Sequence, residues 1–198
     1  ITRQIDAYAR ALGAHGGDVV VSWLPMYHDM GLIACTLLPM MLGQTLVLLD
    51  PFDWVGTPGS LFEAISAHRG TWVWLPNFAF EHLRRAVRPE PGRFDLASVK
   101  AFINCSEPCK SATFDRFVQT FAPLGARRDQ MQVCYAMAES VFAVSQTVPG
   151  QVAKTLRVRG DRLALHEVVP DEAGDVDMLS CGPLLAGCEA QVEHAASD

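Results

Sequence analysis

Two short segments of the chain combine aromatic, acidic and imidazole side chains in an order that suits a nucleotide and a metal ion. In residues 133–140, an apolar run ends at Tyr135, and a single carboxylate follows four positions later, at Glu139, where we expect a helix to start. A tyrosine ring can stack on a base, while a carboxylate can hold Mg²⁺ against phosphate oxygens. The second segment, residues 27–32, carries the neighbouring pair His28 and Asp29. The first segment therefore indicates a nucleotide and metal site, and His28 and Asp29 follow a strand and Pro25, where a side chain can project into a cleft.

Alternating strand-like and helix-like patterns up to about residue 143 predict the scaffold that would position these segments. Apolar, β-rich runs recur at 19–23, 45–49, 72–75, 99–104 and 130–135. Helical patterns separate them, at 1–12, 28–42, 58–68, 77–87 and 114–121. This order predicts an α/β fold, with a mostly parallel sheet and helices on both faces. Ligands of such sheets bind beyond the carboxyl ends of the strands, where we expect Glu107 and Glu139.

From about residue 144 the pattern changes to short β-like runs separated by turn residues. These runs cover 156–158, 164–169, 176–180 and 189–192. We therefore divide the chain into a central α/β subdomain, residues 1–150, and a β-rich peripheral segment or start of the next subdomain, residues 151–198. The chain starts at Ile1 inside a helical pattern that ends at Gly13, so we expect it to be an internal part of a longer polypeptide.

The composition is that of a globular protein and argues against two kinds of partner. With 198 residues and 49% hydrophobic content, the chain can bury a substantial core. The formal net charge is −6 and the basic residues are dispersed, so no nucleic-acid surface is expected. The longest apolar stretch, residues 31–49, is interrupted by Pro39, Gly43 and Gln44, so no membrane span is expected either.

The cysteines are predicted to be reduced thiols, most of them buried. Six cysteines lie mostly inside apolar runs, and none has the spacing of a zinc site. A cytoplasmic location follows as the default expectation. Beyond Lys110, nothing near Cys105 and Cys109 in the sequence would activate a thiol, so we do not expect either to be a nucleophile.

Four segments resemble, in the same order, motifs of the acyl-adenylate-forming enzyme superfamily. They cover residues 22–32, 75–80, 104–108 and 134–139, with a weaker similarity at 180–184. The nearest match is the branch that contains the fatty acyl-AMP ligases and acyl-CoA synthetases, and it concerns the central part of their large N-terminal domain. The resemblance implies an ATP-dependent ligase that activates a fatty or other carboxylic acid as an acyl adenylate. An acyl carrier protein or CoA would then accept the acyl group.

The resemblance also assigns roles to individual residues. The adenine would lie along the backbone of Ser106, Glu107 and Pro108 and stack on Tyr135, with Ala136 and Met137 beside it, and Glu139 would bind Mg²⁺. The acyl substrate would border His28, Met30, Gly31 and Asn77. Simpler interpretations remain for single residues: Glu107 and Pro108 can begin a helix, Tyr135 can be a half-buried strand residue, and His28 can bond local backbone. Trp72 and Trp74 could line an acyl tunnel, although core packing is favoured for each.

Two departures from the family pattern favour a rival hypothesis, a non-catalytic adenylation-like module that binds a nucleotide or a partner protein. Ala136 and Cys105 stand where the family usually has glycine. A required positive φ at either position would cost about 1–2 kcal/mol. The family's phosphate loop, ribose-binding aspartate and catalytic lysine are expected outside these residues. We therefore assign no catalytic residue here, and we expect the segment alone to be inactive.

Overall fold

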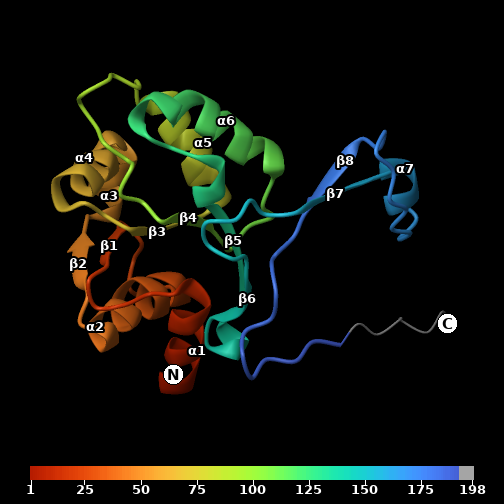
Figure 1. The fold of residues 1–198 in the computed structure, drawn as a ribbon, viewed down its shortest axis with the longest axis horizontal. Helices are drawn as coiled ribbons and strands as arrows, with labels where there is room; N and C mark the ends of the chain where they lie inside the picture. The colour runs from red at the N-terminus through yellow and green to blue at the C-terminus, as the bar shows by residue number, and fades with distance from the viewer. Residues whose placement is uncertain (192–198) are drawn as a thin grey trace.

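A six-stranded sheet forms the centre of the computed structural model within residues 1–191, the part of the chain that the structure describes (Figure 1). Its strands are β1 (Val19–Ser22), β2 (Thr45–Leu48), β3 (Trp72–Leu75), β4 (Ala101–Asn104), β5 (Met131–Ala136) and β6 (Ala143–Gln146). Their spatial order is β2-β1-β3-β4-β5-β6, and all neighbours are parallel except β5 and β6. The predicted α/β class with a mostly parallel sheet is confirmed.

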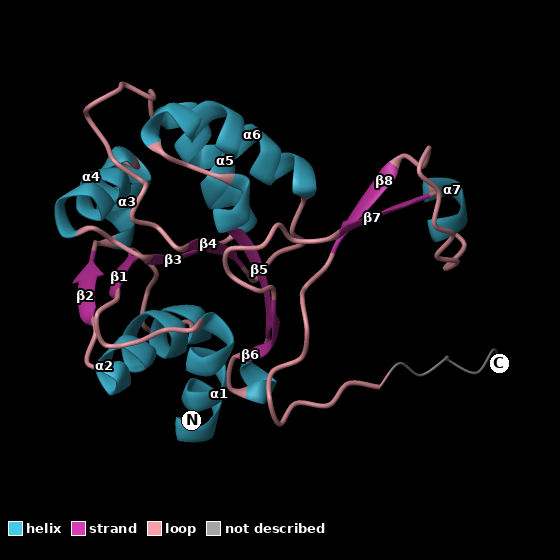
Figure 2. Ribbon diagram, viewed as in Figure 1, coloured by secondary structure: helices cyan, strands magenta, loops and turns pink. Residues whose placement is uncertain are grey.

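Helices cover both faces of this sheet, as predicted (Figure 2). One face carries α1 (Thr2–Leu12), the π-helix η1 (Met30–Leu37) and α2 (Leu38–Leu42); the other carries α3 (Pro51–Gly56), α4 (Gly59–His68), α5 (Asn77–Ala86) and α6 (Ser111–Phe121). Helix α1 ends at Gly13, which has a left-handed conformation (φ 66°), as its sequence pattern predicted. No helix in the described part of the chain is long and apolar enough to cross a bilayer.

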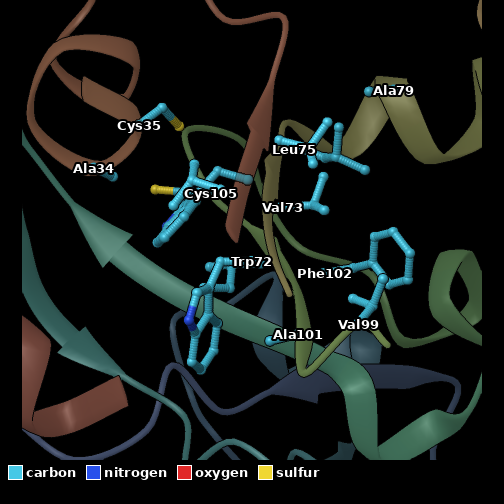
Figure 3. Close-up of a cluster of buried hydrophobic side chains, with 14 of the residues drawn as sticks. Ala34, Cys35, Trp72, Val73, Leu75, Ala79, Val99, Ala101, Phe102 and Cys105 are labelled. Carbon is cyan, nitrogen blue, oxygen red and sulfur yellow. The ribbon is translucent and has the colours of Figure 1, made fainter. Parts of the chain in front are cut away.

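The core is densest around the two central strands. Every residue of β3 and β4 is buried, because helices pack against both faces of these strands (Figure 3). Trp72 is 1% exposed and Trp74 is 0% exposed, which confirms core packing for both tryptophans. Between α5 and α6, Phe80 meets Phe117 edge to face with a ring separation of 5.2 Å. This rigid centre fixes where β4 and β5 end.

Strands β4 and β5 run in the same direction and end at the same edge of the sheet. Their register pairs Phe102 with Met131 and Asn104 with Val133. Residues that follow Asn104 and Val133 therefore emerge side by side at the carboxyl rim. This arrangement brings the turn after β4 next to the end of β5.

The C-terminal part forms a separate small sheet that extends away from the main body (Figure 1). It consists of β7 (Thr155–Val158) and β8 (Val176–Leu179), which are antiparallel, with the short helix α7 (Gly160–Leu163) between them. The predicted β-run at 164–169 is wrong, because α7 is followed by a turn in which His166 has a φ of 62°. Of the predicted run 189–192, residues 189–191 form no strand, and residue 192 lies outside the described residues.

An ion pair between the buried Asp18 and the partly exposed Lys100 stabilises the opposite, amino-terminal rim of the sheet. Asp18, only 1% exposed, accepts a charge-assisted bond from Lys100 at 2.6 Å and a bond from the His15 amide at 3.0 Å. Burial raises the pKa of Asp18, but these donors lower it more, so its net pKa lies below the ordinary 3.8. Asp18 therefore stabilises the fold when it is ionised.

We expect Asp18→Asn to lower the free energy of unfolding at pH 7 by about 1–3 kcal/mol, because Lys100 would lose a buried ionised partner. The contribution of a carboxylate with a depressed pKa is complete above its unfolded pKa and is lost as the pH falls through its folded pKa. Urea unfolding at pH 7 and below pH 4 should therefore show a smaller difference between wild type and variant in acid. Asp161→Asn, at the exposed pair with Arg159, is the control and should change little. An equal loss at both pH values would contradict the role of Asp18.

Candidate functional site

A cavity of about 350 Å³ opens at the carboxyl rim, between the turn after β4 and the end of β5. Its lining combines five of the predicted nucleotide-binding residues with five that were not predicted: Ser106, Glu107, Pro108, Tyr135 and Ala136, and Cys109, Val133, Cys134, Leu179 and Cys181. The volume is in the range of small-ligand sites, and the rim is where open α/β sheets bind ligands. Another cavity, of about 270 Å³, is lined by residues including Thr147 and Lys154, and contains none of the predicted site residues.

Tyr135 provides an aromatic surface at this cavity. It is the next-to-last residue of β5 and 51% exposed, whereas Val133 and Cys134 just before it are buried. The antiparallel pairing with β6 shifts register between Tyr135 and Ala136, so the strand bends where it leaves the sheet. A half-exposed ring on a rigid strand end offers one face to a planar ligand.

The turn after β4 is held by contacts to two helices. The Ser106 hydroxyl lies 3.9 Å from the sulfur of Met30 in η1, and Glu107 Oε1 accepts a bond of 3.3 Å from the amide of Phe78 in α5. Helix α6 begins only at Ser111, so Glu107 and Pro108 do not begin a helix. The turn therefore places Ser106, Glu107 and Pro108 on the cavity wall.

The left-handed residue of this turn is Ser106 (φ 72°), and neither Cys105 nor Ala136 has a positive φ. The two positions where glycine was missing thus carry no strain of this kind. The strain falls on Ser106 instead, at about 1–2 kcal/mol for a residue with a Cβ.

Glu139 lies on a tight connection between β5 and β6, three residues after Ala136 of the cavity lining, and is not itself part of that lining. The connection is a single 3₁₀ turn, η4 (Ala138–Ser140), rather than the predicted start of a helix. The Ser140 hydroxyl lies within hydrogen-bonding distance of two carbonyl oxygens that can accept from it, those of Met137 at 3.0 Å and Phe142 at 3.2 Å. Val141 closes the turn with φ 74° and ψ −48°. This conformation is strained for a β-branched residue, so the surrounding bonds must fix the turn.

The carboxylate of Glu139 is exposed and receives no hydrogen bond or ion pair from the described residues. Within residues 1–191, no group of three or more His, Cys, Asp or Glu side chains is arranged to hold a metal ion. Magnesium is commonly held by one or two carboxylates, with water and substrate phosphates supplying the other ligands. A single free carboxylate fits that mode of binding and does not fit a metal site formed by protein ligands alone.

The residues predicted to border an acyl substrate lie close to the turn after β4, outside the cavity lining. His28 is exposed and its Nδ1 lies 2.6 Å from Asp29 Oδ1, while Met30 is buried beneath Ser106. Gly31 is required by packing, because a Cβ there would lie 2.2 Å from the Pro25 carbonyl oxygen. Asn77 accepts a bond of 3.0 Å from the side chain of the completely buried Asn104. Their assigned role stays a prediction.

Among the lining residues that the sequence did not predict, Leu179 and Cys181 come from the end of β8 and the segment after it. The chain returns there from the small sheet to β6, where Ser145 pairs with Leu184. The weak motif similarity at 180–184 was the one signal in the sequence that pointed to this segment. Its position against the cavity depends on a contact between distant parts of the chain.

The fold and the cavity define an open α/β domain with a ligand-sized site at the carboxyl rim of its sheet. The chain belongs to the AMP-binding enzyme family, whose model matches residues 1–197. The predicted resemblance to acyl-adenylate-forming enzymes is thus confirmed.

Two curated relatives are ligases of fatty acids. The chain is 31% identical over 188 residues to the medium-chain-fatty-acid–[acyl-carrier-protein] ligase JamA of Moorena producens, covering 92% of this chain and 32% of JamA. It is 35% identical over 181 residues to the long-chain-fatty-acid–AMP ligase FadD32 of Mycobacterium marinum, covering 87% and 29%. The chain spans about a third of the length of these relatives.

Solved structures show the same arrangement. The fatty acid AMP ligase from Legionella pneumophila superposes with a TM-score of 0.88 at 28% identity, covering 92% of this chain and 33% of that one. A complex of the L. pneumophila fatty acyl-adenylate ligase with acyl adenylate and pyrophosphate gives a TM-score of 0.85 at the same identity.

Proposed function

We propose that the chain is the central part of an acyl-AMP ligase and that the cavity between β4 and β5 receives the adenosine of ATP. The observation that supports this most directly is that Ser106, in the turn after β4, and Tyr135, near the end of β5, line one cavity in a member of the AMP-binding family. The substrate class is a carboxylic acid, fatty acids first, because the similar ligases are named for fatty acids.

Each wall of the cavity suits one part of a nucleotide. The half-exposed Tyr135 ring can stack on adenine, and the backbone of Ser106 to Pro108 can run along the base edge. Met137, whose sulfur lies 3.9 Å from the Tyr135 hydroxyl, supports that ring. Glu139 would hold Mg²⁺, which would supply positive charge next to the phosphates. The nucleophile is the substrate carboxylate, already ionised at pH 7, so the chain need not provide a general base.

The rival hypothesis of a non-catalytic module loses its main support. It rested on Ala136 and Cys105 replacing glycines, and neither residue has a backbone conformation that needs glycine.

JamA is named as a ligase to acyl carrier protein, which favours such a carrier as the acceptor over CoA. A cytoplasmic location is part of this proposal.

The test is acid-dependent pyrophosphate release by the longer polypeptide, in which this chain is joined to its own flanking segments. We expect release from ATP and Mg²⁺ only when a fatty acid is present, together with formation of acyl-AMP, and no turnover by residues 1–198 alone. Mass spectrometry of the products distinguishes acyl-AMP from simple ATP hydrolysis. A longer polypeptide that forms no acyl-AMP with any of a panel of carboxylic acids of varied chain length would overturn the proposal.

A further inference from the structure

Two thiols from distant parts of the sequence face the same cavity. Cys109 lies in the turn after β4 and is half-buried, whereas Cys181 follows β8 and is exposed. All six cysteines fall within the described residues and are free thiols. The proposed adenylation chemistry uses none of them.

Both residues have defined positions. The Cys181 carbonyl accepts a bond of 2.9 Å from the Ser145 hydroxyl of β6, which fixes its segment against the main sheet. The Cys109 thiol points back toward its own turn, with the carbonyl oxygens of Asn104 and Glu107 at 3.6 and 3.5 Å. Cys181 and Cys109 therefore line one cavity from two segments that are far apart in the sequence, and a rotation of the Cys109 side chain away from its turn would be needed to bring the two sulfurs together.

The other four cysteines differ in setting. Cys35, Cys105 and Cys134 are buried, and Figure 3 shows Cys35 and Cys105 inside the core. Cys188 is half-buried and is not among the residues that line the cavity. Among the described residues no Cys and His cluster is arranged for a metal, so the thiols at the cavity are not explained as ligands. Cys181 is the exposed thiol of the set.

We propose that Cys181 is a thiol modification site for a small disulfide such as glutathione disulfide, and that Cys109 converts the product into a Cys109–Cys181 disulfide that closes the cavity. In the first step the Cys181 thiolate attacks one sulfur of glutathione disulfide, forms a mixed disulfide and releases one glutathione. In the second step Cys109, after losing its proton to water, attacks the Cys181 sulfur and releases the second glutathione. The protein loses two electrons and two protons, and glutathione disulfide is reduced to two glutathiones.

Cys181 reacts before Cys109 because its side chain is exposed, whereas that of Cys109 is half-buried. Burial, followed by the charges of Cys181, Cys105 and Glu107, raises the pKa of Cys109 to about 12. Burial also raises the pKa of Cys181, which is the more exposed of the two thiols. Cys109 therefore carries little thiolate at neutral pH and is a poor first nucleophile, although it lies next to the mixed disulfide once that has formed. Cys181 is open to a tripeptide-sized reagent. The disulfide would exclude a ligand from the cavity. The identity of that ligand as a nucleotide rests on the proposed function.

The test begins with the reduced chain, which is treated with glutathione disulfide and digested under non-reducing conditions for peptide mass mapping. We expect Cys181 to acquire glutathione first and a Cys109–Cys181 peptide pair to accumulate later. In Cys109→Ser the mixed disulfide should persist, and in Cys181→Ser no Cys109 disulfide should form. Cys188→Ser is the matched control and should react like wild type. Lack of modification at Cys181, or a wild-type mixed disulfide that never converts, would overturn the proposal.

The second arm measures AMP binding to the longer polypeptide by calorimetry, before and after this oxidation and again after dithiothreitol. We expect at least a tenfold loss of affinity on oxidation, full recovery on reduction and no loss in Cys181→Ser. Equal AMP affinity in the oxidised and reduced forms would refute closure of the cavity. If the reduced form binds no AMP, the proposed adenosine site is wrong, while the thiol chemistry is still judged by the peptide map.

Discussion

Glu139→Gln is expected to lower the rate of acyl-AMP formation by the longer polypeptide by about 10²–10³-fold, because the variant loses the negative charge that holds Mg²⁺ beside the phosphates. Glutamine keeps the size of the side chain and one oxygen. Since Glu139 is exposed and bonds to no described residue, the replacement should not change the stability of the fold. Pyrophosphate release over a series of Mg²⁺ concentrations measures the effect, and higher Mg²⁺ should recover part of the lost rate.

The same variant separates the ligase from a nucleotide-binding module. Calorimetry with ATP should show affinity that rises with Mg²⁺ in wild type and depends far less on Mg²⁺ in Glu139→Gln. Glu172→Gln removes another exposed carboxylate, in the loop before β8, and serves as the matched control with wild-type behaviour expected. Metal-dependent affinity that is unchanged in Glu139→Gln would remove this residue from its assigned role.

The sequence predicted strands β1 to β5 of the main sheet because their signals are local, whereas the antiparallel edge strand β6 was missed. Helix α6 has apolar residues at helical spacing, with Phe114, Phe117 and Phe121 all buried, and its periodicity alone locates it. Helix α3 was missed although its signals are present: Asp50 caps the amides of Phe52 and Asp53, and Pro51 occupies the first turn. The same Asp50 and Pro51 also suit the end of a strand, so the local pattern supported both interpretations.

The sequence could predict those features of the site that depend only on the order and direction of the strands. Parallel neighbouring strands must end at one rim, which is why Ser106 and Tyr135 could be expected on a common cavity before any coordinates. Backbone conformation was not predictable in the same way. Cys105 and Ala136 stand where the family motifs have glycine, yet the left-handed residue is Ser106, because the bend falls one position after Cys105. Nor could local pattern place Cys181, whose position depends on the return of the chain to β6.

That return of the chain depends on Gly182, and Gly182→Ala is expected to lower the free energy of unfolding by about 3–5 kcal/mol. A Cβ at this position would lie 2.2 Å from the carbonyl oxygen of Gln146 and 2.4 Å from the amide nitrogen of Thr147. Both are backbone atoms of or next to β6, so neither can rotate away. Relief of the clash would move the segment from β6 and break the bond from the Gln146 amide to the Pro183 carbonyl. Urea unfolding of both chains measures the loss.

Gly187→Ala provides the control that separates the clash from the backbone conformation. Gly182 and Gly187 have φ values of 81° and 87°, so an alanine costs about 1–2 kcal/mol at either position for its left-handed φ. At Gly187 an added Cβ meets nothing within 4 Å, so the loss of unfolding free energy should be limited to the cost of the left-handed φ. The excess loss at Gly182 therefore measures how tightly the returning segment is pressed on β6. Equal losses in the two variants would mean that the segment is free to shift, and the cavity wall at Cys181 would then not be fixed.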